Sequence, residues 1–169
     1  IRPRDWSSDV CSSDLLHRWG GTPIVDLLVE RIRAGATLVA SSAAAAACGR
    51  STMPVYEIYK AGANPRWLDG LDILATMTGI AAAVVPHWNN SEGATHDTSR
   101  CFVGEARLLQ LERLLPHGTA VLGIDEHTAL TVDLGAQSIA VSGKGAVTIR
   151  TPGVGETSDR KSTRLNSSH

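Results

Sequence analysis

Three chemically reactive groups each follow a short apolar run in this sequence: the hydroxyl of Ser42, the imidazole of His87, and the carboxylates of Asp125-Glu126. A serine hydroxyl becomes a useful nucleophile when an imidazole accepts its proton, and a carboxylate fixes the tautomer of that imidazole. Because the carboxyl ends of parallel strands lie along one edge of a sheet, groups distant in sequence can converge there. The sequence therefore contains the groups that a serine-based acyl transfer requires.

The segment around Ser42 has the pattern of a strand that turns at once into a helix. A β-prone run, 37–40, meets the pair Ser41-Ser42 and continues into the alanines 43–47. At such a junction the residue at the bend is displaced from the sheet, and the first N–H groups of the helix point toward it. This geometry suits a nucleophile, and the alternative is a tight connection in which Ser42 is only the N-cap.

The two ends of the chain have an origin different from the rest. One DNA element, read as codons on one strand, encodes residues 5–14, and the opposite strand encodes residues 159–169. The element resembles a common short-read sequencing adapter, so we exclude 1–15 and 159–169 from the fold and expect both tails to be disordered. The remaining part, 16–158, is then expected to be a fragment of one domain that lacks its N-terminal part.

Composition excludes several classes of function for residues 16–158, which carry 11 basic and 13 acidic side chains. The basic residues are scattered, so nucleic-acid binding is not expected. No apolar run reaches the roughly 20 residues of a membrane span, so no membrane partner is expected either. Cys48 and Cys101 are far apart, which favours two buried thiols over a disulfide framework.

Periodicity and turn residues predict the elements that would position the reactive groups. Thr22 as N-cap and Pro23 at the first position predict a helix that ends at Gly35. The other predicted elements are a strand at 36–41, a helix at 43–48, a strand at 80–85, a helix from Asp97 or Thr98 to Pro116, a strand at 120–124, and an antiparallel meander of 128–133, 137–142 and 146–151. Such a chain belongs to the α/β class, with helices packed on a parallel sheet.

Several motifs resemble those of the peptidase S51 group, which includes cyanophycinase and dipeptidase E. Segment 40–45 is similar to the nucleophile elbow of that group. The similarity extends to the cyanophycinase-like branch through residues 54–60, 85–90, 97–102 and 123–130. The resemblance implies a class I glutamine-amidotransferase-like fold, that is, a three-layer α/β/α flavodoxin-like domain with a parallel sheet, here partial and followed by the antiparallel meander. It also implies a cytoplasmic serine exopeptidase that needs no cofactor and no metal.

The resemblance assigns roles to individual residues. Ser42 corresponds to the nucleophile and His87 to the base, and the amide N–H of Ala43 is the oxyanion donor that this segment supplies. The acidic member of the triad is expected to be Glu57, which lies between the serine and the histidine as in the family, and Glu126 is the alternative.

The expected ligand is a small peptide or an amino-acid-derived substrate, and the intact protein is expected to form a homodimer. Arg100 is predicted to bind a substrate carboxylate, opposed by the alternative of an intramolecular ion pair. Asn89 and Asn90 are predicted to orient substrate or to shape a turn. A separate hypothesis is a metal site, whose ligands would be His87, His96, Asp97 and His127.

Two departures from the family favour an alternative function. Glycines of the family elbow are replaced by Ala40 and Ala44, and a methyl group at either place can displace Ser42. The loop expected to supply a second oxyanion donor is absent from this sequence. The alternative is therefore a catalytically impaired, amidotransferase-like binding domain, and the fragment itself is expected to be inactive and poorly soluble because its sheet edge is unpaired.

Overall fold

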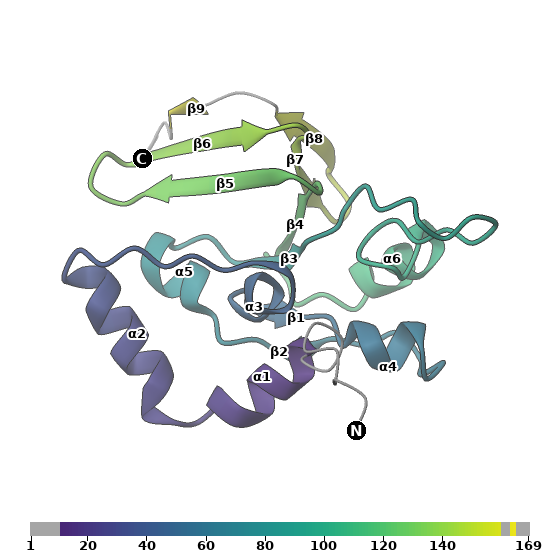
Figure 1. Ribbon diagram of the computed structural model, residues 1–169, viewed down its shortest axis with the longest axis horizontal. Helices are drawn as coiled ribbons and strands as arrows, with labels where there is room; N and C mark the ends of the chain where they lie inside the picture. The colour runs from purple at the N-terminus through teal and green to yellow at the C-terminus, as the bar shows by residue number, and fades with distance from the viewer. Residues whose placement is uncertain (1–10, 160–162, 165–169) are drawn as a thin grey trace, which may run out of the picture.

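The computed structural model describes residues 11–159 and 163–164 as a mixed α/β structure, which confirms the predicted class (Figure 1). Its elements in chain order are α1 (Ser12–Trp19), α2 (Pro23–Arg33), α3 (Ser42–Ala47), β1 (Ser51–Thr52), α4 (Val55–Tyr59), β2 (Leu68–Asp69), α5 (Ile73–Thr78), β3 (Ala82–Val85), α6 (Glu105–Glu112), β4 (Ala120–Ile124), β5 (Thr128–Asp133), β6 (Ser138–Gly143), β7 (Val147–Thr151), β8 (Gly155–Asp159) and β9 (Thr163–Arg164). Within the described ranges, no helix is long and apolar enough to cross a bilayer.

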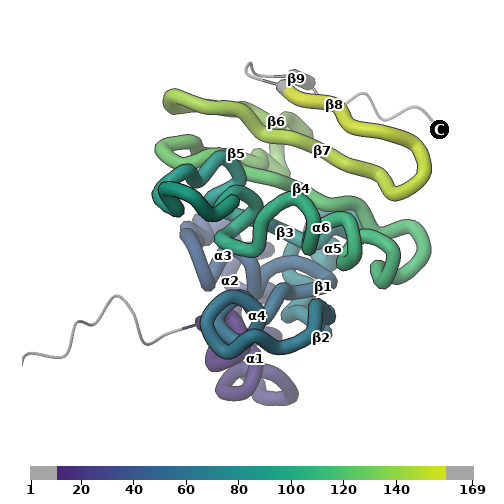
Figure 2. Tube along the Cα trace, turned by 90° about the vertical axis from the view of Figure 1, so that its right-hand side faces the viewer, coloured from purple at the N-terminus to yellow at the C-terminus, as the bar shows by residue number. Residues whose placement is uncertain are grey.

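The main sheet has the strand order β3-β4-β7-β8, and Figure 2 shows these strands stepping from the teal middle of the molecule to its yellow edge. Strands β3 and β4 are parallel, whereas β7 pairs antiparallel with β4 and with β8. Val85 lies opposite Gly123 in the parallel pair, so the chain leaves both strands at the same edge. This register brings the segments that begin at His87 and Asp125 together, as the sequence predicts.

The predicted strand at 36–41 is wrong. The structure has no secondary structure at 36–41, and no described strand pairs with this run. Val39 is 87% exposed, and Leu38 is exposed as well. Apolar β-branched residues favour a strand only where neighbours pack against them, and this run has none. Helices α2 and α3 on either side of it do form, and α3 packs against β3.

The predicted meander is half right. Strands β5 and β6 form an antiparallel hairpin in a sheet of their own, but β7 leaves that hairpin and joins β4. Two hydrogen bonds between Asp125 and Ala146 hold the start of β7 beside β4. The Asp125 N–H donates to the Ala146 carbonyl, and the Ala146 N–H donates to the Asp125 carboxylate. The hairpin therefore belongs to a second sheet, drawn above the main sheet in Figure 1, and Leu130 and Val141 pack it against the main-sheet residues Val84, Leu122 and Val147.

Helix ends agree with the predicted caps only in part. Thr22 accepts the Ile24 N–H at 3.4 Å and begins α2, as predicted. Helix α6 begins at Glu105, later than predicted, because Arg100, Cys101 and Phe102 all have positive φ and cannot be helical. Asp97 still caps this helix from a distance, since its Oδ2 accepts the Glu105 N–H at 2.8 Å.

The expectation that tail 1–15 is disordered is wrong for its described part. Residues 12–15 form the first turn of α1, and Ser12 is 3% exposed and donates to the Met53 carbonyl at 2.7 Å. Asp159 likewise ends β8, and 163–164 form β9 beside β6. A polar segment can thus acquire structure from partners that its own composition does not reveal. Residues 1–10, 160–162 and 165–169 lie outside the described residues.

The larger core cluster lies beneath the chain segment that carries His87. Its buried members are Met53, Ile58, Val85, Trp88, Cys101, Val103, Leu108, Leu111 and Val121. The segment after β3 is therefore anchored by Trp88, one residue beyond the histidine.

Candidate active site

Ser42 is the first residue of α3 and has the strained backbone of a nucleophile elbow, with φ of 47°. Its Oγ lies 3.0 Å from the Nε2 of His87. Ser41, not Ser42, occupies the N-cap position of α3, and its side chain makes no capping bond. The N-cap alternative for Ser42 is therefore wrong, and the side chain is directed at an imidazole instead.

His87 follows β3 and also has a positive φ, of 51°. Backbone bonds hold the segment on both sides of the ring, because Trp88 N–H donates to the Ile124 carbonyl and Cys101 N–H donates to the His87 carbonyl. Strained residues that are held by surrounding bonds cluster at functional sites. The imidazole is thus fixed between the end of β4 and the turn before α6.

Glu126, the second residue after β4, is the carboxylate that contacts His87. Its Oε1 lies 3.0 Å from the His87 Nδ1 and accepts a second bond from the Asn90 amide at 2.8 Å. The Glu126 N–H donates to Asn89 Oδ1 at 2.8 Å, so both asparagines hold this residue. The hydrogen bonds from Asn90 and His87 lower the pKa of Glu126 and keep its carboxylate ionised.

Glu57, the expected acidic residue, does not take this position. The only described carboxylate that hydrogen-bonds His87 is that of Glu126, and Glu57 Oε2 is buried without a hydrogen-bond partner among the described residues. Tyr56 and Tyr59 of helix α4 line the cavity beside Ser42, whereas Glu57 does not. Successive residues of a helix are turned by about 100°, so Glu57 lies on a different face of α4 from Tyr56. The chain order suggested by the family therefore selects the wrong carboxylate for this geometry.

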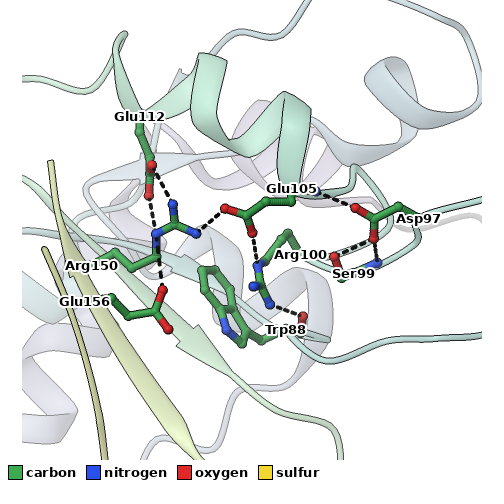
Figure 3. A network of polar contacts seen from close by, with 8 residues as sticks. All are labelled: Trp88, Asp97, Ser99, Arg100, Glu105, Glu112, Arg150 and Glu156. Carbon is green, nitrogen blue, oxygen red and sulfur yellow. Dashed lines mark hydrogen bonds and ion pairs between the residues drawn. The ribbon is translucent and has the colours of Figure 1, made fainter.

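Arg100 makes the intramolecular ion pair that was its alternative prediction (Figure 3). Its Nε donates to Glu105 at 2.7 Å, its Nη1 donates to the Trp88 carbonyl at 3.1 Å, and its guanidinium lies 4.1 Å from the Trp88 ring. These contacts occupy the group that was expected to bind a substrate carboxylate. Arg100 supports the backbone beside His87 instead.

A second arginine completes the network behind Trp88. Figure 3 shows Glu105 bridging Arg100 and Arg150, with the indole of Trp88 beside both guanidinium groups. Burial alone would raise the pKa of Glu105, but the hydrogen bonds from Arg150 and Arg100 outweigh it and hold that pKa below its usual value. Sequence reasoning missed Arg150, because only the pairing of β7 with β4 brings it under α6.

Asn89 and Asn90 act on Glu126 in this structure, and Ala43 remains available for the predicted oxyanion role. The Ala43 amide follows Ser42 at the start of α3, and it makes no hydrogen bond to a described residue. A free backbone N–H beside the nucleophile is the usual donor to a developing oxyanion.

A cavity of about 310 Å³ opens beside Ser42 and His87. Its remaining lining residues are Cys11, Ser12, Ala43, Ala46, Val55, Tyr56, Tyr59, Lys60, Pro86, Cys101 and Phe102. Helix α4, between β1 and β2, thus contributes to the site. A substrate in this cavity would lie against the reacting hydroxyl.

Other reactive groups of the described chain do not form a competing centre. Burial raises the pKa of the Cys48 thiol and raises that of Cys101 to about 12, so both remain protonated. Across residues 11–159, no three His, Cys, Asp or Glu side chains lie close enough to hold a metal ion. His87, His96, Asp97 and His127 therefore do not come together as a metal site.

Comparison with known protein families finds no family that matches this chain. A search of curated proteins finds no match either.

Proposed function

We propose that this chain is the catalytic part of a serine hydrolase, with Ser42 as nucleophile, His87 as general base and Glu126 as the orienting carboxylate. One observation carries the proposal: Ser42 Oγ, the two ring nitrogens of His87 and Glu126 Oε1 form a continuous chain with 3.0 Å at each link. This arrangement matches the roles of a Ser-His-acid triad.

The geometry supports one path for the proton. With Nδ1–H donating to the ionised Glu126, the His87 Nε2 is the free acceptor that faces Ser42. Attack of Ser42 Oγ on a carbonyl carbon then transfers the hydroxyl proton to Nε2, and the imidazolium is stabilised by Glu126. The Ala43 amide donates to the oxyanion, and the bond from the carbonyl carbon to the leaving group breaks as the imidazolium protonates that group. Water, deprotonated by His87, then attacks the acyl-Ser42 ester, which releases the acid and returns the proton to Ser42.

The substrate class and the family are further parts of this proposal. Ser42 at the bend, His87 after β3 and Glu126 after β4 all lie in motifs that resemble the cyanophycinase-like branch of peptidase S51. The parallel pair β3-β4 is compatible with a flavodoxin-like sheet. We therefore propose small peptides as substrates, cleaved by a cytoplasmic exopeptidase-like enzyme.

A serine-directed fluorophosphonate tests the nucleophile directly. In the intact protein, wild type is expected to be labelled once, at Ser42, and Ser42→Ala is expected to remain unlabelled. Ser41→Ala is the matched control, because the neighbouring hydroxyl is exposed and makes no capping bond. Labelling that survives Ser42→Ala overturns the proposal.

A panel of acidic and β-linked dipeptides tests the substrate class with the same three proteins. Turnover by wild type and Ser41→Ala, lost in Ser42→Ala, supports a peptidase. If a folded wild type neither reacts with fluorophosphonate nor cleaves a dipeptide, the alternative of an amidotransferase-like binding domain replaces the hydrolase.

A further inference from the structure

The cavity beside Ser42 has an aromatic wall that the catalytic chemistry does not require. Val55, Tyr56 and Tyr59 of α4 face it from one side, and Phe102 faces it from the turn before α6. We propose that this cavity binds an apolar or aromatic acyl group of the substrate. The inference rests on the proposed hydrolase, whose scissile carbonyl it places between Ser42 and this wall.

The wall is continuous with the catalytic imidazole. The ring centroids of Tyr59 and Phe102 are 5.8 Å apart, and those of Phe102 and His87 are 5.6 Å apart. Both separations lie within the range of favourable aromatic pairs. An acyl chain that contacts Tyr59 and Phe102 therefore has its carbonyl end beside His87 and Ser42.

The charged side chains that line the cavity indicate which ligand charges it favours. Among the described lining residues, Lys60 is the only charged one besides the titratable His87 and the thiols, and its Nζ lies 5.0 Å from the centroid of the Tyr56 ring. Arg100 is paired with Glu105, and Glu126 is hydrogen-bonded by Asn90. No described carboxylate lines the cavity, so none is placed to attract a cation. A neutral or anionic side chain on the acyl group fits this wall, and a cationic side chain is disfavoured by Lys60.

The cavity volume also fits a small ligand. About 310 Å³ is at the lower end of the range for small-molecule pockets, and such pockets are mainly apolar with a few polar groups that fix orientation. The polar lining groups here include Ser42, His87 and Lys60. The apolar and aromatic lining residues leave space for a short aromatic acyl chain beside Ser42.

Two esters with the same leaving group test the acyl side alone: p-nitrophenyl acetate and p-nitrophenyl 3-phenylpropanoate. After correction for the hydroxide rate of each ester, we expect wild-type kcat/KM to favour the aromatic ester by about 10-fold or more, as contacts in an apolar pocket do. Tyr59→Ala and Phe102→Ala are expected to reduce this ratio toward unity. Leu109→Ala, an exposed apolar residue of α6 outside the cavity, should keep the wild-type ratio.

A binding measurement separates failure of this inference from failure of the hydrolase. Isothermal titration of Ser42→Ala with 3-phenylpropanoate is expected to show binding that acetate lacks, and the added Tyr59→Ala change should abolish it. Ser42-dependent acetate hydrolysis with a ratio near one overturns the acyl cavity and leaves the hydrolase standing. Binding of 3-phenylpropanoate without any hydrolysis supports the cavity and removes the hydrolase. Absence of both binding and preference overturns the cavity.

Discussion

At the scale of single residues, the carboxylate of Glu126 is held more firmly than its position in a turn suggests. The carboxylate meets His87 and the Asn90 amide, while the Glu126 backbone N–H meets Asn89. Three partners from the segment after β3 thus fix one residue after β4. The tautomer of His87 depends on this arrangement, because only an ionised and oriented carboxylate keeps the proton on Nδ1.

Glu126→Gln should reduce the fluorophosphonate labelling rate of Ser42 by about 10³-fold, because an amide no longer enforces the reactive tautomer of His87. The rate is measured by intact-protein mass spectrometry over time. Glu57→Gln is the matched control, since Glu57 does not hydrogen-bond His87 in this structure, and its rate should stay within about threefold of wild type. If Glu57→Gln slowed labelling strongly and Glu126→Gln did not, Glu57 would be the carboxylate that orients His87.

Asn90→Ala should raise the pKa of Glu126, because the Asn90 hydrogen bond is the largest cause of its lowered value. The stabilisation from a depressed carboxylate pKa is present above the ordinary value and is lost as pH falls through the folded-state value. The variant should therefore lose more unfolding free energy at pH 7 than near pH 3. Carboxyl NMR titration gives the pKa, and urea unfolding at the two pH values gives the stability.

Asn89→Ala is the control for that titration, since Asn89 accepts from the Glu126 backbone and leaves the carboxylate bonds intact. Equal pKa shifts in both asparagine variants would contradict the assignment to Asn90.

The proximity of Ser42 and His87 could be predicted from the sequence, and the carboxylate partner of His87 could not. The bend at Ser42 and the polar residues after the apolar run 80–85 are local signals. The choice between Glu57 and Glu126 depends on which helix face and which strand end approach the imidazole. That information exists only after β3 and β4 have paired and α4 has packed.

At the scale of elements, Gly123 of β4 lets the segment that carries His87 pack closely on the strand, because glycine has no side chain there. A Cβ atom built on Gly123 would lie 2.3 Å from the Cδ2 of Trp88, so the indole packs directly on the strand backbone. Trp88 N–H also donates to the Ile124 carbonyl of the same strand. Strand β4 therefore supports His87 from below and presents Glu126 at its end.

Gly123→Ala should displace Trp88, destabilise the fold by about 1–3 kcal/mol and slow Ser42 labelling, because overpacking moves neighbouring side chains. Urea unfolding and the labelling rate measure the two effects. Gly135→Ala in the β5-β6 turn is the matched control, since its Cβ would meet only Asp133 Oδ1 at an ordinary 3.5 Å. Unchanged labelling in a destabilised Gly123→Ala protein would refute the support of His87 by Trp88.

Elements with a local signal were predictable, and those that depend on distant pairing were not. The capping of α2 by Thr22 and the apolar runs of β3 and β4 are local, and all three elements formed. The run 36–41 has the same β-prone composition but no partner, and the strand 147–151 chose β4 over its neighbour β6. A sequence window contains propensity, whereas pairing is decided by the remainder of the chain.

At the scale of the whole molecule, Arg150 joins three parts that are distant in sequence. It lies on β7, pairs with Glu105 and Glu112 of α6, and its guanidinium lies 5.8 Å from the centroid of the Trp88 ring (Figure 3). Its side chain is only 13% exposed. The helix, the sheet and the histidine segment are thus connected through one cation.

Arg150→Met should destabilise the protein by about 2–4 kcal/mol, because Glu105 and Glu112 then remain partly buried without their shared cation. Arg50→Met removes the exposed ion pair with Asp72 and should cost less than about 1 kcal/mol. Urea unfolding at low and high salt measures both, and salt should shrink only the already small Arg50 effect, since buried pairs are weakly screened. A similar loss in both variants would mean that Arg150 acts as an ordinary surface charge, and the connection between α6, the sheet and His87 would then have to rest on apolar packing around Trp88.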